Sequence, residues 1–140
     1  MLVNIPTFGD TAELQFPHKI LIVDDEPYNQ EALKNILKIT LGLTSCPDSV
    51  IDKFTDCAND GQDALSKVKS LFEDQGKVYK IIFMDLNMPK MGGIESSALI
   101  REYMGSLDSK IEQTAIIALT GDNPEDCEEL TKEAGMDSII

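Results

Sequence analysis

The chain has 140 residues, a length that corresponds to one domain with a core of ordinary size. Hydrophobic residues make up 42% and charged residues 26%, which is typical of a globular protein and excludes a disordered chain. With 12 basic and 25 acidic side chains, the formal net charge is −13. This charge argues against binding of nucleic acid or of an anionic membrane by the chain itself, because both require a basic surface.

Cysteine and histidine are too few for most metal sites. The three cysteines, Cys46, Cys57 and Cys127, are widely spaced and contain no CxxC pair, which excludes a cysteine zinc site and indicates reduced thiols. His18 is the single histidine, so a histidine-rich site is excluded as well. No apolar run approaches the ~20 residues of a membrane span, and the first residues lack the pattern of a signal peptide. We therefore expect a cytoplasmic protein.

Short apolar runs predict the strands of a buried sheet. Residues 1–18 show no sustained period, and we interpret them as a linker or tail in front of a domain at 19–140. Runs that are rich in isoleucine and lack polar alternation are typical of parallel strands buried on both faces. We expect strands at 20–23, 53–58, 79–86, 115–119 and, at its beginning, 137–140, with an extended surface loop at 44–52.

Helical patterns lie between these runs. The expected helices begin at Pro27, at Asp60-Gly61, after Gly92-Gly93 (with Ile94, Ala98 and Leu99 on one face) and at Asn123-Pro124, the last running to Gly135. Strands and helices thus alternate along the whole domain. This order predicts right-handed crossovers and an α/β fold with a doubly wound parallel sheet covered on both faces.

Polar residues follow three of the predicted strands. Asp24 and Asp25 end the first, Asp85 ends the third, and Thr120 ends the fourth. Each feature alone is also typical of a turn or a helix N-cap. The carboxyl ends of parallel strands meet at one edge, however, so we expect these side chains to lie together. Three adjacent carboxylates repel one another, and Mg²⁺, which prefers oxygen ligands, relieves that repulsion. The backbone carbonyl of Asn87 offers one more oxygen ligand.

Four segments carry a resemblance to a known family. They are ILIVDDE at 20–26, IFMDLNMPKMGG at 82–93, IALTG at 117–121 and EAGMD at 133–137. In this order and spacing, residues 19–140 resemble the receiver domain of two-component response regulators and hybrid histidine kinases. The resemblance implies a flavodoxin-like fold with strand order 2-1-3-4-5. The opening Pro27-Tyr28-Asn29 and the long loop before the second strand favour the hybrid-kinase type.

The resemblance also implies roles for the residues at the strand ends. Asp85 is expected to accept a phosphoryl group from the phosphohistidine of a histidine kinase or histidine phosphotransfer protein. Asp24, Asp25, Asp85 and the Asn87 carbonyl are expected to hold Mg²⁺, and the Thr120 hydroxyl to contact the phosphoryl oxygens and act as the switch. Such a domain phosphorylates and dephosphorylates itself without turning over an independent substrate. It is expected in the cytoplasm, by itself or as the cytosolic part of a larger membrane-bound kinase.

The sequence departs from the family pattern at its carboxyl end. The lysine that receiver domains carry on the fifth strand falls two residues beyond Ile140, so we expect a truncated domain with an incomplete fifth strand and no last helix. A strand exchanged between two copies is one way to complete such a sheet. The aromatic switch position aligns with Ile139, which is aliphatic. Asn87 and Asp122 occupy the positions that tune the lifetime of the phosphate, and both are polar, from which we expect a moderately short lifetime.

Two alternative functions remain open at this point. One is a Mg²⁺-dependent phosphatase with an aspartyl nucleophile, although such enzymes need a second acid where this chain has Asn87, an amide that cannot transfer a proton in that role. The other is a receiver-like binding module that does not use phosphate. The absent lysine favours that module, and the intact acidic residues argue against it.

Overall fold

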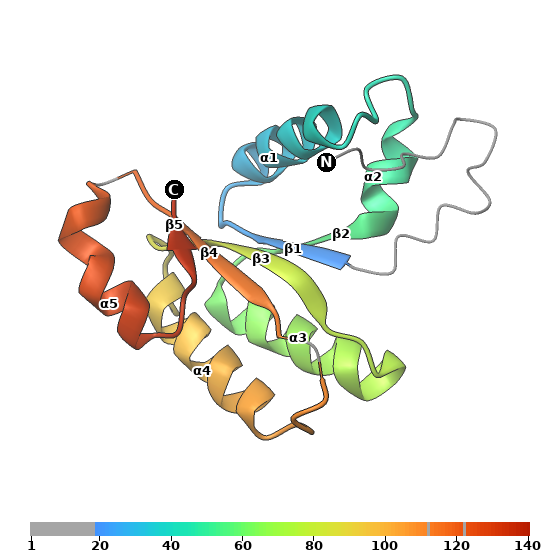
Figure 1. Cartoon of the computed structure of the whole chain (residues 1–140). Coiled ribbons are helices and arrows are strands. Elements are labelled where there is room, and N and C mark those ends of the chain that lie inside the picture. The colour runs from blue at the N-terminus through green and yellow to red at the C-terminus, as the bar shows by residue number, and fades with distance from the viewer. Residues whose placement is uncertain (1–18, 112, 122) are drawn as a thin grey trace.

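The computed structural model describes residues 19–111, 113–121 and 123–140, so the predicted tail and Asp122 lie outside the described residues. Helices separate successive strands along the chain, with two of them between the first strand and the second (Figure 1). Their bounds are β1 Lys19–Val23, α1 Pro27–Thr40, α2 Asp48–Phe54, β2 Thr55–Ala58, α3 Gly61–Gln75, β3 Tyr79–Asp85, α4 Gly93–Gly105, β4 Ala115–Leu119, the 3₁₀ helix η2 Pro124–Cys127, α5 Glu128–Glu133 and β5 Ser138–Ile139.

The strands form one parallel sheet with the order β2-β1-β3-β4-β5, which confirms the predicted order. Helices α1 and α2 cover one face, and α3, α4 and α5 cover the other (Figure 1). Two register pairs position the site: Val23 lies beside Met84, and Asp85 lies beside Leu119. The carboxyl ends of β1, β3 and β4 therefore end at nearly the same level of the sheet.

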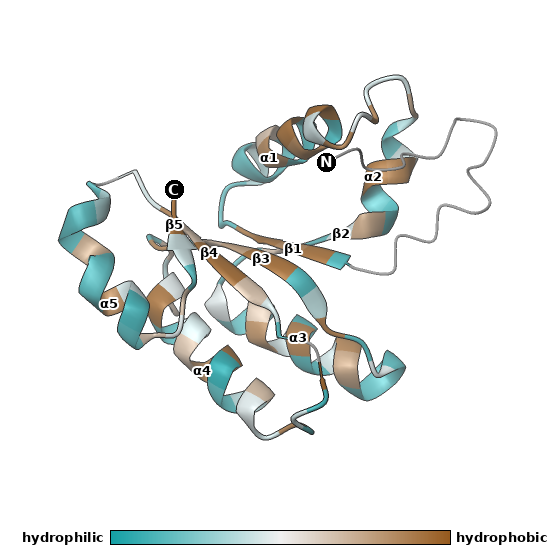
Figure 2. Cartoon of the chain, in the orientation of Figure 1, coloured by the Kyte–Doolittle hydropathy of each residue, from teal (hydrophilic) through white to brown (hydrophobic). Residues whose placement is uncertain are grey.

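The core lies on both faces of the sheet. On the side of α3 and α4, alternate strand residues such as Leu21, Ile82 and Ile116 are fully buried. On the side of α1, Ile20, Ile22 and Phe83 pack with side chains of that helix. The central strands β1, β3 and β4 are accordingly largely apolar, while the helices carry many hydrophilic residues (Figure 2). Continuous apolar strands are what a sheet buried on both faces requires.

The loop predicted at 44–52 is wrong, because a helix, α2, begins at Asp48 and ends at Phe54. Its residues Val50, Ile51 and Phe54 are buried in a small cluster at the end of α1. On the surface, Lys38 Nζ lies 2.6 Å from Asp48 Oδ1. The second strand therefore starts at Thr55 and not at residue 53. Seven residues are too few for a clear helical period, which explains the error.

The buried face of α4 also differs from the prediction. Ala98 is exposed, whereas Ser96, Ser97, Ile100 and Met104 are buried. The reason is close packing of α4 against α3, in which the Ser96 hydroxyl donates a hydrogen bond of 2.8 Å to the Gly61 carbonyl. A small polar residue can be buried when its hydroxyl is bonded in this way. The predicted fourth helix is confirmed in place but begins as the 3₁₀ turn η2. No helix within the described residues is both long and apolar enough to cross a membrane.

Candidate functional site

Three carboxylates from two neighbouring strands gather at one edge of the sheet. One carboxylate oxygen each from Asp24, Asp25 and Asp85 lies within 4.8 Å of the other two. The pairing of Val23 with Met84 accounts for this proximity, because Asp24 and Asp85 are the residues that follow this pair. Asp24 is buried, and Asp25 and Asp85 are half-buried. The acidic cluster predicted from the sequence is therefore confirmed.

Asp24 is held in place by hydrogen bonds. Its Oδ1 accepts a bond of 2.9 Å from the backbone N–H of Glu26 and a longer one of 3.4 Å from Asn29 Nδ2. The buried side chain of Gln30 donates from Nε2 to the Asp24 carbonyl at 2.7 Å and to Asn59 Oδ1 at 3.1 Å. Gln30 thus ties the end of β1 to the residue after β2. Nothing in the sequence predicts this role of Gln30, since a glutamine one turn into a helix carries no distinctive signal.

The environment of Asp85 is unfavourable for the charge of its carboxylate. Its Oδ1 accepts a hydrogen bond of 3.1 Å from the N–H of Asn87. Burial raises the pKa of its carboxyl above the ordinary value, and the charges of Asp24 and Asp25 raise it further, although the N–H groups of Asn87 and Leu86 oppose the rise. A carboxylate in such a position is a good ligand for a cation, because a cation removes the penalty of the charge.

The loop after Asp85 requires glycine at one of its two glycine positions. A Cβ at Gly93 would collide with the carbonyl oxygen of Asp85 and would lie 2.9 Å from Met84 Cγ. At Gly92 the nearest atom to such a Cβ is the Leu86 carbonyl oxygen at 3.4 Å, which is an ordinary contact. Gly93 therefore permits the start of α4 to pass close behind the predicted phosphoacceptor.

Thr120 follows β4 directly, next to the residue that pairs with Asp85. The backbone N–H of Leu86 donates to the Leu119 carbonyl at 3.1 Å, so the ends of β3 and β4 are bonded to each other. The backbone N–H of Thr120 itself donates to the Ile140 carbonyl at 3.3 Å. The structure thus places Thr120 at the same edge of the sheet as the three carboxylates. Asn87 is exposed in the loop beyond Asp85.

The residues at this edge fit a hard divalent cation. Three carboxylates within 4.8 Å of one another supply only oxygen ligands, and their mutual repulsion disfavours the cluster without a cation. Asn87 adds a backbone carbonyl within the same loop. The acidic charge and oxygen chemistry of this ligand set are those that Mg²⁺ prefers.

Comparison with known proteins agrees with this geometry. Residues 20–140 match the model of the response regulator receiver domain. The chain belongs to this family. The osmosensing histidine protein kinase SLN1 of Saccharomyces cerevisiae is 37% identical over 112 residues, which are 80% of this chain and 8% of SLN1. The hybrid signal transduction histidine kinase L of Dictyostelium discoideum is 34% identical over 87% of this chain and 6% of its own length.

A solved receiver domain shows the same fold. The receiver domain of the histidine kinase CKI1 from Arabidopsis thaliana, in complex with Mg²⁺ and BeF₃⁻, matches with a TM-score of 0.70 and 28% identity. The match covers 94% of this chain and 85% of that one. The chain therefore spans most of a solved receiver domain but less than a tenth of the length of the two curated kinases. The predicted family and flavodoxin-like fold are confirmed.

Proposed function

We propose that this receiver domain accepts a phosphoryl group on Asp85. The donor is the phosphohistidine of a histidine kinase or histidine phosphotransfer protein, and Asp24, Asp25, Asp85 and the Asn87 carbonyl hold Mg²⁺. The observation that carries the proposal is the cluster of three carboxylates at one edge of the sheet, with oxygens within 4.8 Å of one another. The kinases that this chain resembles support the identity of the donor.

The transfer is a displacement at phosphorus. A carboxylate oxygen of ionised Asp85 attacks the phosphorus, an O–P bond forms, and the P–N bond to the donor imidazole breaks. The electron pair of that bond stays on the imidazole nitrogen, which takes a proton from solvent. When bound, Mg²⁺ supplies positive charge that offsets the carboxylates and the phosphoryl oxygens. The Asp24 carboxylate is held in a fixed position before the donor arrives, because its Oδ1 accepts hydrogen bonds from Glu26 N–H and Asn29 Nδ2.

Thr120 and hydrolysis complete the proposed cycle. The Thr120 hydroxyl donates a hydrogen bond to a phosphoryl oxygen of the acyl phosphate, which couples the new charge to the end of β4. Water then attacks the phosphorus, releases inorganic phosphate and restores the Asp85 carboxylate. The domain turns over no other substrate. A phosphatase would need a general acid two residues after its nucleophile, where this chain has the exposed amide Asn87.

The relatives support a proposal for the setting of the domain. The matched part is less than a tenth of the curated kinases, so we propose that this receiver domain acts as one module of a phosphorelay that includes a kinase of the hybrid type. It would meet its donor in the cytoplasm.

Phosphoramidate tests the proposal, because it is a small donor with the same type of P–N bond as phosphohistidine. Intact mass is measured after incubation with phosphoramidate, with Mg²⁺ and with a chelator. We expect one phosphoryl adduct that requires Mg²⁺ and is absent from Asp85→Asn. Glu129→Gln removes an exposed carboxylate elsewhere and serves as the control that still reacts. A folded wild-type chain that gains no adduct would overturn the proposal in favour of a static binding module.

A further inference from the structure

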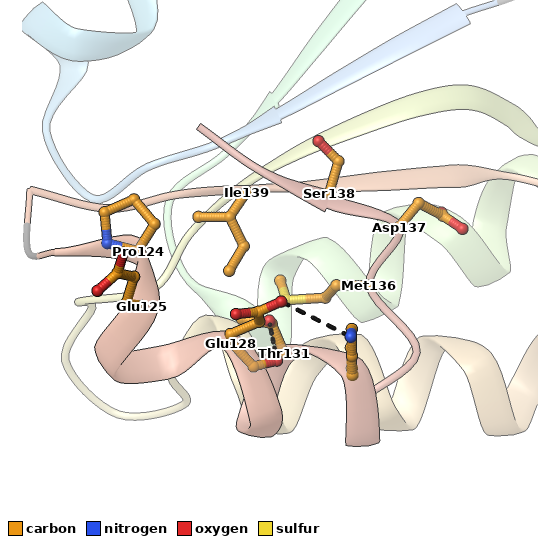
Figure 3. A pocket seen from close by; sticks show the side chains of 9 residues that line it. Pro124, Glu125, Glu128, Thr131, Met136, Asp137, Ser138 and Ile139 are labelled. Atoms are coloured by element: carbon orange, nitrogen blue, oxygen red, sulfur yellow. Dashed lines mark hydrogen bonds and ion pairs between the residues drawn. The ribbon is translucent and has the colours of Figure 1, made fainter.

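The last strand of the sheet is short and lies at its edge, with Ser138 exposed and Ile139 half-buried against the core. β5 consists of Ser138 and Ile139 and, among the strands that the structure describes, pairs only with β4. Between β5 and α5 lies an open pocket of about 280 Å³, lined in part by Thr131, Met136 and Ile139 (Figure 3). Side chains that face such a space lose contacts on one side. Packing of Ile139 against the core on one side therefore leaves a role for hydrogen bonds in holding β5 in place.

Arg101 supplies three of these hydrogen bonds from the buried side of α4. Its Nε donates to the Gly135 carbonyl, its Nη1 to the Thr114 carbonyl and its Nη2 to Asp137 Oδ2, each at 2.7 Å. Thr114 precedes β4, and Gly135 and Asp137 form the turn that enters β5. One guanidinium thus joins the beginnings of β4 and β5 to α4.

Asp137 extends this contact into the sheet. Its Oδ2 also accepts a hydrogen bond of 2.8 Å from the backbone N–H of Ile116, and its own N–H donates to the Ile116 carbonyl at 2.8 Å. Asp137 lies at the rim of the pocket below β5 (Figure 3). Gly135 has a φ of +82°, and a Cβ there would lie 2.7 Å from Arg101 Cγ, so the turn fits closely around the arginine.

The register fixed at Asp137 continues to Thr120. Ile117 pairs with Ser138 and Ala118 with Ile139, and the N–H of Ile140 donates to the Ala118 carbonyl at 2.9 Å. The ladder ends at the bond from the Thr120 N–H to the Ile140 carbonyl. Asp137 and Ile140 are only three residues apart. A shift of the turn at Asp137 therefore also moves the Ile140 carbonyl, which accepts the hydrogen bond from the Thr120 N–H.

We infer that Arg101, through Asp137, is a positioning residue that sets the register of β5 on β4 and thereby fixes the backbone of Thr120. The effect on phosphoryl transfer rests on the proposed function, whereas the effect on Thr120 does not. Only an arginine can serve all three acceptors, because its planar guanidinium has donors in several fixed directions while a lysine offers a single point charge.

Amide hydrogen exchange tests this inference directly. The variants are Arg101→Met, Arg101→Lys and the control Lys132→Met, which removes a nearby cation whose pair with Glu128, at 3.6 Å, is exposed. In both Arg101 variants we expect the Thr120 and Ile140 amides to exchange about tenfold faster or more, as for the loss of a charge-assisted hydrogen bond. Amides of Ile22 in β1 should keep their protection, and the control should resemble the wild type throughout.

The phosphorylation rate with phosphoramidate, measured where all variants are folded, gives the second readout. We expect it to fall in both Arg101 variants while Mg²⁺ affinity, measured by titration, stays within twofold of the wild type. Equal loss of protection in Ile22 and Thr120 would mean a merely structural role and overturn the inference, as would unchanged protection at Thr120. If the wild type fails to gain phosphate but the local loss at Thr120 is seen, the proposed function fails and the positioning role of Arg101 stands.

Discussion

Replacement of Asp85 by asparagine should stabilise the metal-free domain, which is unusual for a change at the centre of a site. The substitution removes one of three charges whose oxygens lie within 4.8 Å of one another. At that distance each pair of charges repels by about 0.9 kcal/mol in bulk water and about 3.5 kcal/mol at an effective dielectric constant of about 20. Because Asp85 and Asp25 are half-buried, we expect a net gain of about 1–3 kcal/mol at pH 7 and low salt.

The dependence on pH follows from the raised pKa of Asp85. The pKa of the Asp85 carboxyl is higher in the folded state than in the unfolded state, where it is about 4. Its protonation therefore favours folding fully below about pH 4, and this contribution is lost as the pH rises through the folded-state pKa. The gain from Asp85→Asn should therefore be largest at neutral pH and shrink in acid. It should also shrink when Mg²⁺ is added, because Mg²⁺ stabilises the wild type more than the variant.

Urea unfolding in a chelating buffer at several pH values measures this difference, with circular dichroism as the signal. Glu129→Gln is the matched control, since it removes an exposed acidic charge away from the cluster and should change stability by no more than about 0.5 kcal/mol. A metal-free Asp85→Asn variant that is less stable than the wild type at pH 7 would refute the repulsion among the three carboxylates.

Two further predictions concern the surroundings of the site and the opposite end of the sheet. Gly93→Ala should destabilise the domain by about 1–3 kcal/mol, because its Cβ would collide with the Asp85 carbonyl oxygen, while Gly92→Ala should cost less. Thermal unfolding of the two variants compares these costs, and equal costs would contradict the close approach of Gly93 to Asp85. Burial and a 2.7 Å hydrogen bond to Asp56 raise the pKa of Tyr79, so its phenol should stay protonated around pH 10, where free tyrosine titrates, and its contribution to stability should decline only above that pH. Phenolate absorbance at alkaline pH is compared between the wild type and Tyr79→Phe, and we expect the same titration near pH 10 in both. A part of the wild-type titration near pH 10 that is missing from the variant would contradict the prediction, because that part would belong to Tyr79.

The parts of the fold that were predicted correctly are those with strong local patterns. The apolar runs that became β1, β3 and β4 end in polar residues, so both the strands and the meeting of Asp24, Asp25 and Asp85 followed from the sequence. The helix α3 was also found, since Asp60 caps it by accepting a hydrogen bond of 2.8 Å from the Asp63 N–H. The strands and the helix cap depend on residues close together in the chain, and the parallel pairing of β1 with β3 then brings Asp85 beside Asp24.

The parts that were missed depend on contacts between distant residues. Helix α2 is stabilised by burial of Val50 and Phe54 against the end of α1, which no window of seven residues reveals. The buried face of α4 follows from the close contact of Ser96 with α3. Arg101 contacts residues 13 to 36 positions away, and nothing in its local sequence distinguishes it from a surface arginine. Tertiary packing decides each of these cases.

The most direct test of the central claim locates the phosphoryl group. The wild-type domain is incubated with phosphoramidate and Mg²⁺ and then reduced with borohydride, which converts an aspartyl phosphate to homoserine, and the product is digested and sequenced by mass spectrometry. Homoserine at position 85, absent when Mg²⁺ is chelated, is the result we predict. Homoserine in place of a different aspartate, or a phosphoryl adduct that gives no homoserine after reduction, would contradict Asp85 as the phosphoacceptor.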